Sequence, residues 1–275
     1  MEVLEGEILE SLKIKYKEKQ MATVKEFNDY GEILEKFLIF KTSPLAVKMI
    51  TTESDIPKGA YRPKRDDGYH YSQCQAFALS RREKKTVAML KEDNWCPAPI
   101  TAFGLDERPE RPDMVPGKPM GYYCFKPGKY IGILTAPLRD AAYTPDVVLM
   151  YPNPHQLRVL LLALSPEEIE NLKSHFFPPS CTYAVVNPIM TGHCWVVLPD
   201  VGENFRALGD EGEMMFSVPA STMDGLISSL KKTEERLGRF STGNTIMMPD
   251  FPQPEHYKRA FKMWGLDYDK SNKYR

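Results

Sequence analysis

The sequence lacks the short motifs by which many cofactor-dependent enzymes are recognised. Its 275 residues contain no G-x-G-x-x-G, no P-loop, no H-E-x-x-H and no G-x-S-x-G sequence. These absences argue against the familiar kinds of dinucleotide, nucleotide triphosphate, zinc-protease and α/β-hydrolase chemistry. The missing motifs do not exclude a flavin or another cofactor that is bound without a short motif.

Long apolar runs and an excess of charge are also missing. No apolar run reaches the roughly 18 residues of a membrane-spanning helix, and residues 1–5 lack the hydrophobic region of a signal peptide. Lys and Arg number 36 against 37 Asp and Glu, so the net charge of −1 gives no general attraction to nucleic acid or to an acidic membrane. We therefore expect a cytoplasmic protein that binds neither nucleic acid nor membrane.

The five cysteines include no C-x-x-C pair. An odd number of cysteines in a reducing compartment argues against disulfides and favours free thiols or metal ligands. The missing pair disfavours ferredoxin-type spacing and a thioredoxin-like dithiol. Cys124 lies among aromatic residues, so we expect it in the core.

Three of these cysteines occupy positions where thiolates tend to be exposed. Cys74 and Cys181 stand at expected helix N-termini, where free backbone N–H groups and the helix dipole stabilise negative charge. Cys96 precedes Pro97, which favours extended backbone in a loop. Such positions are typical of metal-bound or reactive thiolates. The alternative is that all three are inert core residues.

Helix signals recur along the chain. Thr23 and Glu26 form a capping box, and Asn153 is an N-cap followed by proline. The patterns predict helices over residues 1–40, 74–82, 156–164, 221–237 and 255–264, and a short helix that starts after Cys181 and ends near Gly192. Segments 51–70 and 97–129 resemble loops, and a long irregular segment like the second is often functional.

Apolar runs between these helices predict strands. They cover residues 44–50, 85–90, 130–135, 146–151, 194–198 and 213–218. A strand, a tight turn and a helix over residues 146–164 form the unit of an α/β or α+β sheet. We therefore predict a single α/β or α+β domain over residues 41–275, with a mixed sheet and flanking helices. An N-terminal helical arm over residues 1–40 would precede it.

Several short motifs resemble the DUF169 family in order and spacing. They are Pro44–Lys48, Cys74-Gln75-Ala76, Cys96-Pro97, Pro145–Leu149, Asn153-Pro154, Ser180-Cys181 and the segment from Gly209 to Ala220. The likeness runs from about residue 30 to about residue 240. The family is largely uncharacterised and is frequent in anaerobic bacteria and archaea. This chain departs from the family after Cys96, where residues 97–100 replace the usual small glycines.

The resemblance implies an iron–sulfur centre on Cys74, Cys96 and Cys181. Iron–sulfur clusters are normally held by four thiolates. Three thiolates would leave one iron of a [4Fe–4S] cluster to a substrate, a water or another ligand. An open metal position is typical of a Lewis-acid site. Cys194 is the first candidate for a fourth thiolate, although a cysteine that opens a β-run more often packs in the core.

Three further side chains are candidates for acid–base work near such a cluster. His193 could donate a proton, whereas a histidine in a turn is more often a surface residue. His70 and Tyr71 shortly precede Cys74 and could line the same pocket.

The leading hypothesis is therefore an iron–sulfur protein that performs redox or Lewis-acid chemistry on a small organic substrate in anaerobic metabolism. It would be an oxidoreductase or a lyase, with segment 97–128 covering the substrate. One alternative is a non-catalytic electron-transfer or cluster-carrier protein that serves a redox partner. Another is a metal-free small-molecule binding protein. The sequence leaves open whether the protein forms a homo-oligomer.

Overall fold

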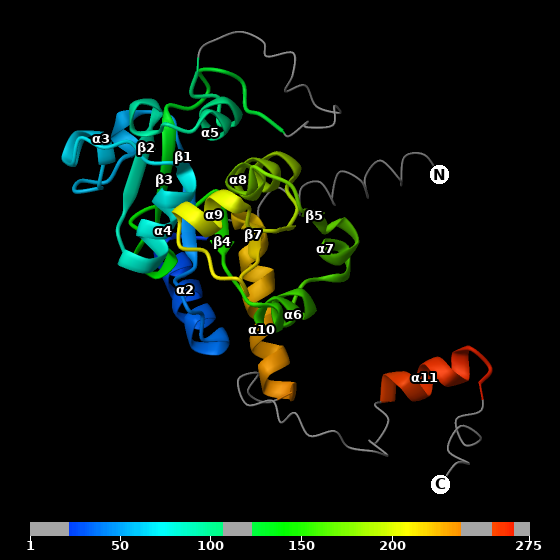
Figure 1. The fold of residues 1–275 in the computed structure, drawn as a ribbon. Coiled ribbons are helices and arrows are strands. Elements are labelled where there is room, and N and C mark those ends of the chain that lie inside the picture. Colours follow the sequence, from blue (N-terminus) through cyan, green and yellow to red (C-terminus); the bar gives the residue numbers. More distant parts are fainter. Residues whose placement is uncertain (1–21, 107–122, 238–254, 267–275) are drawn as a thin grey trace, which may run out of the picture. The chain divides into compact units, whose positions relative to one another are not determined.

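A computed structural model describes residues 22–106, 123–237 and 255–266. Its centre is a seven-stranded sheet in the order β2-β3-β1-β4-β7-β6-β5 (Figure 1). Neighbouring strands are antiparallel except β5 and β6, which are parallel. Because helices pack on both faces, the structure confirms the predicted α/β or α+β class with a mixed sheet.

All strands except β5 coincide with the apolar runs of the sequence. In chain order they are β1 (Leu45–Ile50), β2 (Val87–Leu90), β3 (Gly132–Pro137), β4 (Val147–Met150), β5 (Lys173–His175), β6 (Trp195–Val197) and β7 (Met215–Pro219). The sequence does not predict β5, because this short edge strand is polar and mostly exposed.

The central strand β1 shows how the sheet separates two cores. Leu45, Val47 and Met49 belong to one core cluster, and Ala46 and Ile50 belong to the other. This is the alternation of side chains along a strand. Since both faces are covered, the strand is almost continuously buried and its sequence is apolar throughout except at one position.

Three helices cover the first face, which Ala46 and Ile50 line. They are α2 (Val24–Leu38), α6 (Pro154–Leu162) and α10 (Met223–Leu237). Thr23 caps α2 in the predicted capping box, and Phe27 and Leu34 on this helix are buried in the core of the sheet. The predicted arm over residues 1–40 thus differs from the structure, because its described part packs into the main core. Residues 1–21 of that prediction lie outside the described residues.

The second face carries the helices that begin at the cysteines. They are α4 (Gln73–Glu83), α5 (Pro97–Ala102) and α8 (Ser180–Thr191), and α9 (Val201–Arg206) packs against α4. α5 lies within the segment 97–129 that was expected to be irregular. It forms because Cys96 is extended and Pro97 occupies the first helical position. The N–H group of that position has no partner within the helix, so a proline can stand there without the loss of a hydrogen bond. Residues 107–122 of that segment lie outside the described residues.

Short helical turns complete the described elements. They are η1 (Glu53–Asp55), α3 (Pro63–Asp66), η2 (Lys91–Asp93), η4 (Leu138–Asp140), α7 (Pro166–Asn171) and η5 (Ala220–Thr222). Two of them, η1 and α3, interrupt the predicted loop over residues 51–70. Each contains too few residues to show a helical period in the sequence.

The chain divides into two compact units, residues 1–241 and residues 242–275. The second unit contains α11 (Glu255–Met263), which the sequence predicts correctly. Of the helices in the described ranges, none combines the length and the apolarity needed to cross a membrane.

Gly31 allows α2 to approach the turn η4 closely. A Cβ atom at this position would lie 2.6 Å from the backbone N of Arg139. We therefore expect Gly31→Ala to lower the free energy of unfolding by about 1–2 kcal/mol, because overpacking outweighs the better helix propensity of alanine. Gly225→Ala is the matched control, since a Cβ there has no neighbour within 4 Å. Chemical denaturation should show no loss for this control; an equal loss in both variants would contradict the packing argument.

Candidate functional site

Backbone pairing brings the segments of Cys74 and Cys96 together. The N–H of Tyr71 donates to the carbonyl of Asp93 at 2.9 Å, and the N–H of Trp95 donates to the carbonyl of Tyr71 at 3.2 Å. These bonds form a parallel bridge outside the main sheet. α4 begins just after the bridge on one segment, and α5 begins just after it on the other. The two cysteines therefore lie on paired segments although they are far apart in sequence.

One carboxylate joins the helix of Cys181 to α9. Asp200 caps α9, and its Oδ1 accepts from the N–H groups of Gly202 at 2.7 Å and Glu203 at 3.2 Å. Its Oδ2 accepts from the N–H of Ser180, the first residue of α8, at 2.8 Å. A carboxylate is favoured at the N-termini of both helices, because it accepts from their free N–H groups and interacts with the positive ends of the helix dipoles.

α9 also contacts the segments of the other two cysteines. The thiol of Cys74 lies 3.7 Å from the carbonyl of Gly202, to which it donates. The charge of Arg206, at the end of α9, partly offsets the larger effect of burial, which raises the pKa of Cys74. Its guanidinium lies 5.1 Å from the ring centre of Trp95, the neighbour of Cys96. α9 thus links all three segments, and we call Cys74, Cys96, Cys181, Glu203 and Arg206 the cysteine site.

The thiols of the cysteine site share one electrostatic environment. Burial raises the pKa of Cys181 well above its usual value. The charges of neighbouring groups raise it further, in the order Cys74, Glu203, Asp200 and Cys96. Burial, followed by the charge of Glu203, raises the pKa of Cys74 to about 11. The charges of the three cysteines and of the acidic residues of α9 are therefore within reach of one another.

The prediction of exposed thiolates is wrong for two of the three cysteines. Cys74 is 4% exposed and Cys181 is 7% exposed, whereas Cys96 is half-buried. The helix starts on which Cys74 and Cys181 lie pack against α9 and do not open to solvent. Since burial disfavours the charged form, both groups are thiols at neutral pH unless a cation replaces the proton.

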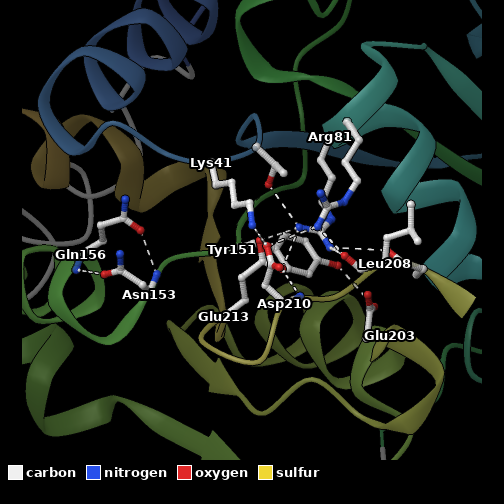
Figure 2. A network of polar contacts seen from close by, with 12 residues as sticks. Lys41, Arg81, Tyr151, Asn153, Gln156, Glu203, Leu208, Asp210 and Glu213 are labelled. Carbon is white, nitrogen blue, oxygen red and sulfur yellow. Dashed lines mark hydrogen bonds and ion pairs between the residues drawn. The ribbon is translucent and has the colours of Figure 1, made fainter. Parts of the chain in front are cut away.

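A buried polar network holds Glu203 (Figure 2). Its Oε1 accepts from the hydroxyl of Tyr151 at 3.3 Å. The guanidinium of Arg81 lies 3.9 Å from the ring centre of Tyr151, and its Nη1 donates to both oxygens of Glu213 at 2.9 Å. Burial raises the pKa of Glu203 to about 8, against the opposing effect of Arg81. Glu203 is therefore a buried acid whose negative form is poorly compensated.

An open cavity of about 660 Å³ adjoins this network. Tyr151 and Glu213 line it together with Asn153. Lys41 and Asp210, which also line it, form an ion pair at 2.6 Å. Tyr151 therefore connects the cavity with the cysteine site, because it lines the cavity and its hydroxyl contacts Glu203.

Buried polar atoms without a partner accompany the cysteines. Among the described residues no hydrogen-bond partner exists for Gln73 Oε1 and Nε2, Asn94 Nδ2, Ser180 Oγ and Glu203 Oε2. Gln73 and Ser180 directly precede Cys74 and Cys181, and Asn94 precedes Cys96 by two residues. Each unsatisfied buried polar group costs about 1–3 kcal/mol, so such groups need an explanation in a native structure. A bound polar group is one such explanation.

No group of three or more His, Cys, Asp and Glu side chains within the described ranges is arranged to hold a metal ion. The thiolates around a single zinc ion must all lie about 2.3 Å from it, so their sulfur atoms nearly touch. An iron–sulfur cluster instead offers a separate iron to each thiolate and requires a wider spacing. The donor groups of the cysteine site are three thiols and one carboxylate, which are ligand types that iron accepts.

The structure does not bring Cys194 to the cysteine site. Cys194 is fully buried in the core cluster of the first face, whereas Cys181 belongs to that of the second face. Alternation along β6 explains this, because Trp195 and Val197 point to the second face. Burial and the nearby Glu168 raise the pKa of Cys194 well above its usual value.

The predicted acid–base residues also lie apart from the thiols. His70 is exposed. Tyr71 supplies backbone to the bridge, and its side chain forms a hydrogen bond with Tyr61. His193 is half-buried in the turn after α8, where its N–H donates to the hydroxyl of Thr191 at 3.4 Å. Within the described residues, no hydrogen bond or ion pair joins any of these side chains to a cysteine of the site.

Sequence reasoning missed the acidic and basic residues of α9. A signal for this helix does exist, because Asp200 is followed three residues later by Glu203, as in a capping motif. That signal marks a helix start. It does not reveal that Glu203 and Arg206 reach Cys74, which depends on the packing of α9 against α4.

Fold and site together define an α/β or α+β protein with a mixed sheet and a group of cysteines at the starts of helices, two of them buried. The sequence profile of the DUF169 family, described as uncharacterised ArCR, matches residues 33–229. The chain therefore belongs to the DUF169 family, which confirms the resemblance seen in its motifs. The matched region includes all residues of the cysteine site. Neither curated proteins nor solved structures give a match.

Proposed function

We propose that this protein binds a [4Fe–4S] cluster through Cys74, Cys96 and Cys181 and uses it for redox or Lewis-acid chemistry on a small organic substrate. The proposal places it in the cytoplasm and in anaerobic metabolism. One observation carries it: three thiols at separate helix starts lie within electrostatic reach of one another, each with a buried polar atom nearby that lacks a partner among the described residues.

The charge of the cysteine site supports this proposal. Each thiolate there would raise the free energy of the next, and the charge of Glu203 adds to this repulsion. Arg206 is a cation within reach of Cys74, but its side chain is exposed. Buried like charges are stabilised when a metal centre neutralises them and replaces the thiol protons.

The residues around the thiols would hold and shield the cluster. A bound cluster supplies an electron-transfer centre and an iron with Lewis acidity. Gln73 Nε2 and Ser180 Oγ are buried donors beside the ligands, and donors of this kind tune a cluster by hydrogen bonds to its sulfurs. Arg206 and the half-exposed Trp95 lie at the outer side, where the guanidinium is suited to an anionic group such as a substrate carboxylate.

Iron and acid-labile sulfide after anaerobic purification test the proposal. We expect about four of each per chain and a broad visible absorption. Cys74→Ser and Cys181→Ser should lose most of both, because each removes one of only three thiolates. Cys124→Ser and Cys194→Ala should retain both, because neither residue belongs to the cysteine site. Wild-type protein without iron and sulfide, never exposed to air, would refute the proposal.

Two other functions predict different results in the same experiment. An electron-transfer or cluster-carrier protein would hold a cluster whose spectrum does not respond to small organic molecules. A metal-free binding protein would hold none. The buried atoms that lack partners among the described residues favour a bound group over an empty core, so we place the cluster-dependent enzyme first.

A further inference from the structure

We infer that Glu203 is the fourth protein ligand of the cluster, through its Oε2. This inference rests on the proposed function and deepens it, because it names the group at the corner that the three cysteines leave open. The residue would supply an oxygen ligand, which iron accepts alongside thiolates.

The position of Glu203 in α9 brings it to the thiols. It follows Gly202, whose carbonyl accepts from the Cys74 thiol at 3.7 Å. The N-terminus of α9 is in turn fixed to the helix of Cys181 through Asp200. Glu203 thus follows the residue that contacts Cys74, on a helix whose capping residue is bonded to the helix of Cys181.

The two carboxylate oxygens of Glu203 differ in their surroundings. Oε1 accepts from the Tyr151 hydroxyl at 3.3 Å (Figure 2). Oε2 is buried and has no hydrogen-bond partner in the part of the chain that the structure describes. The residue itself is 0% exposed. A buried carboxylate with one oxygen satisfied and one free is costly unless a cation meets the free oxygen.

The other acidic residues near Glu203 are already engaged. Asp200 uses both oxygens on the N–H groups of α8 and α9. Glu213 uses both oxygens on Arg81. Cys194, the fourth ligand suggested by the sequence, lies in the core of the opposite face. Glu203 is therefore the acidic group that combines burial, a free oxygen and a position next to the residue that contacts Cys74.

An oxygen ligand also suits an enzyme. Carboxylate oxygens bind a soft iron site less strongly than thiolates do. The iron held by Glu203 is thus the one that a substrate oxygen would reach most easily. A fully thiolate-bound cluster would lack this position.

Glu203→Gln tests the inference while preserving the size of the side chain. We expect the variant to retain the three thiolate-bound irons and to lose the fourth on mild oxidation, giving about three irons per four sulfides and the EPR signal of a three-iron cluster. Wild-type protein treated identically should keep about four irons. Glu211→Gln is the matched control, because it makes the same substitution at an exposed glutamate outside the cysteine site; it should behave like wild type.

Mössbauer spectra of iron-57-labelled wild-type protein give a second measurement that needs no folded variant. Three irons should share one environment, and the fourth should show an oxygen-ligated one. A cluster with four equivalent irons overturns the inference and leaves the proposed function intact. So does a Glu203→Gln cluster that is as stable as wild type with an unchanged spectrum. A wild-type protein without a cluster overturns both.

Discussion

Replacing Arg81 with methionine should lower the free energy of unfolding by about 3–5 kcal/mol, the usual cost of breaking a buried ion pair from one side. Arg81 is the largest fully buried side chain, and it neutralises Glu213, whose side chain is only 5% exposed. Its guanidinium also packs on the ring of Tyr151 at 3.9 Å. The variant leaves the carboxylate of Glu213 buried without its cation. Urea denaturation at neutral pH measures the effect.

A double variant separates the missing charge from the missing volume. In Arg81→Met with Glu213→Leu, no unpaired carboxylate is left, so most of the lost stability should return. Arg139 provides a surface comparison. It pairs with Glu32 and Glu35, but its side chain is 43% exposed, so Arg139→Met should cost less than about 1 kcal/mol. If Arg81→Met lowered the free energy of unfolding no more than Arg139→Met does, the buried pair of Arg81 and Glu213 would not determine the stability of the fold.

The sheet could be predicted from the sequence because both of its faces are covered. Strands of this kind are apolar almost throughout, as in Val147–Met150, and they contrast sharply with their polar surroundings. β5 lacks this contrast, since it lies at the sheet edge and contains Lys, Ser and His. α9 was missed for a related reason: it has only six residues, and Val201 and Phe205 on it are exposed. Short elements at an edge or over a site carry little periodic signal.

The site was predictable only in part. Local rules located Cys74 and Cys181 at helix starts, because capping residues and prolines mark such starts in the sequence. The same rules suggested exposure, which depends instead on what packs over the helix end. Glu203 could not be found in this way, since its approach to Cys74 depends on a contact between α4 and α9. The pairing that aligns Cys74 with Cys96 likewise arises from a bridge between Tyr71 and Asn94.

Stability of the metal-free protein should fall as pH rises from about 4.5 to about 8, and Glu203→Gln should remove this loss. Burial raises the pKa of Glu203 from 4.5 to about 8. Below this interval the residue is protonated in both the folded and the unfolded chain, and it has no effect. Within the interval the unfolded chain releases the proton while the folded chain retains it. Each pH unit then costs ~1.4 kcal/mol at most. Above about 8 the loss is complete and constant.

Denaturation of chelator-treated wild type and Glu203→Gln at pH 4.5, 6.5 and 8.5 measures this difference. The two proteins should have similar stability at the lowest pH, and the variant should be the more stable at the highest. Glu211→Gln is the surface control, because Glu211 is exposed, and it should follow the wild type at each pH. Equal pH profiles for wild type and Glu203→Gln would show that the folded protein stabilises the Glu203 carboxylate without a metal. The buried free oxygen of Glu203 would then no longer indicate a bound cation, because the cost that a cation relieves would be absent.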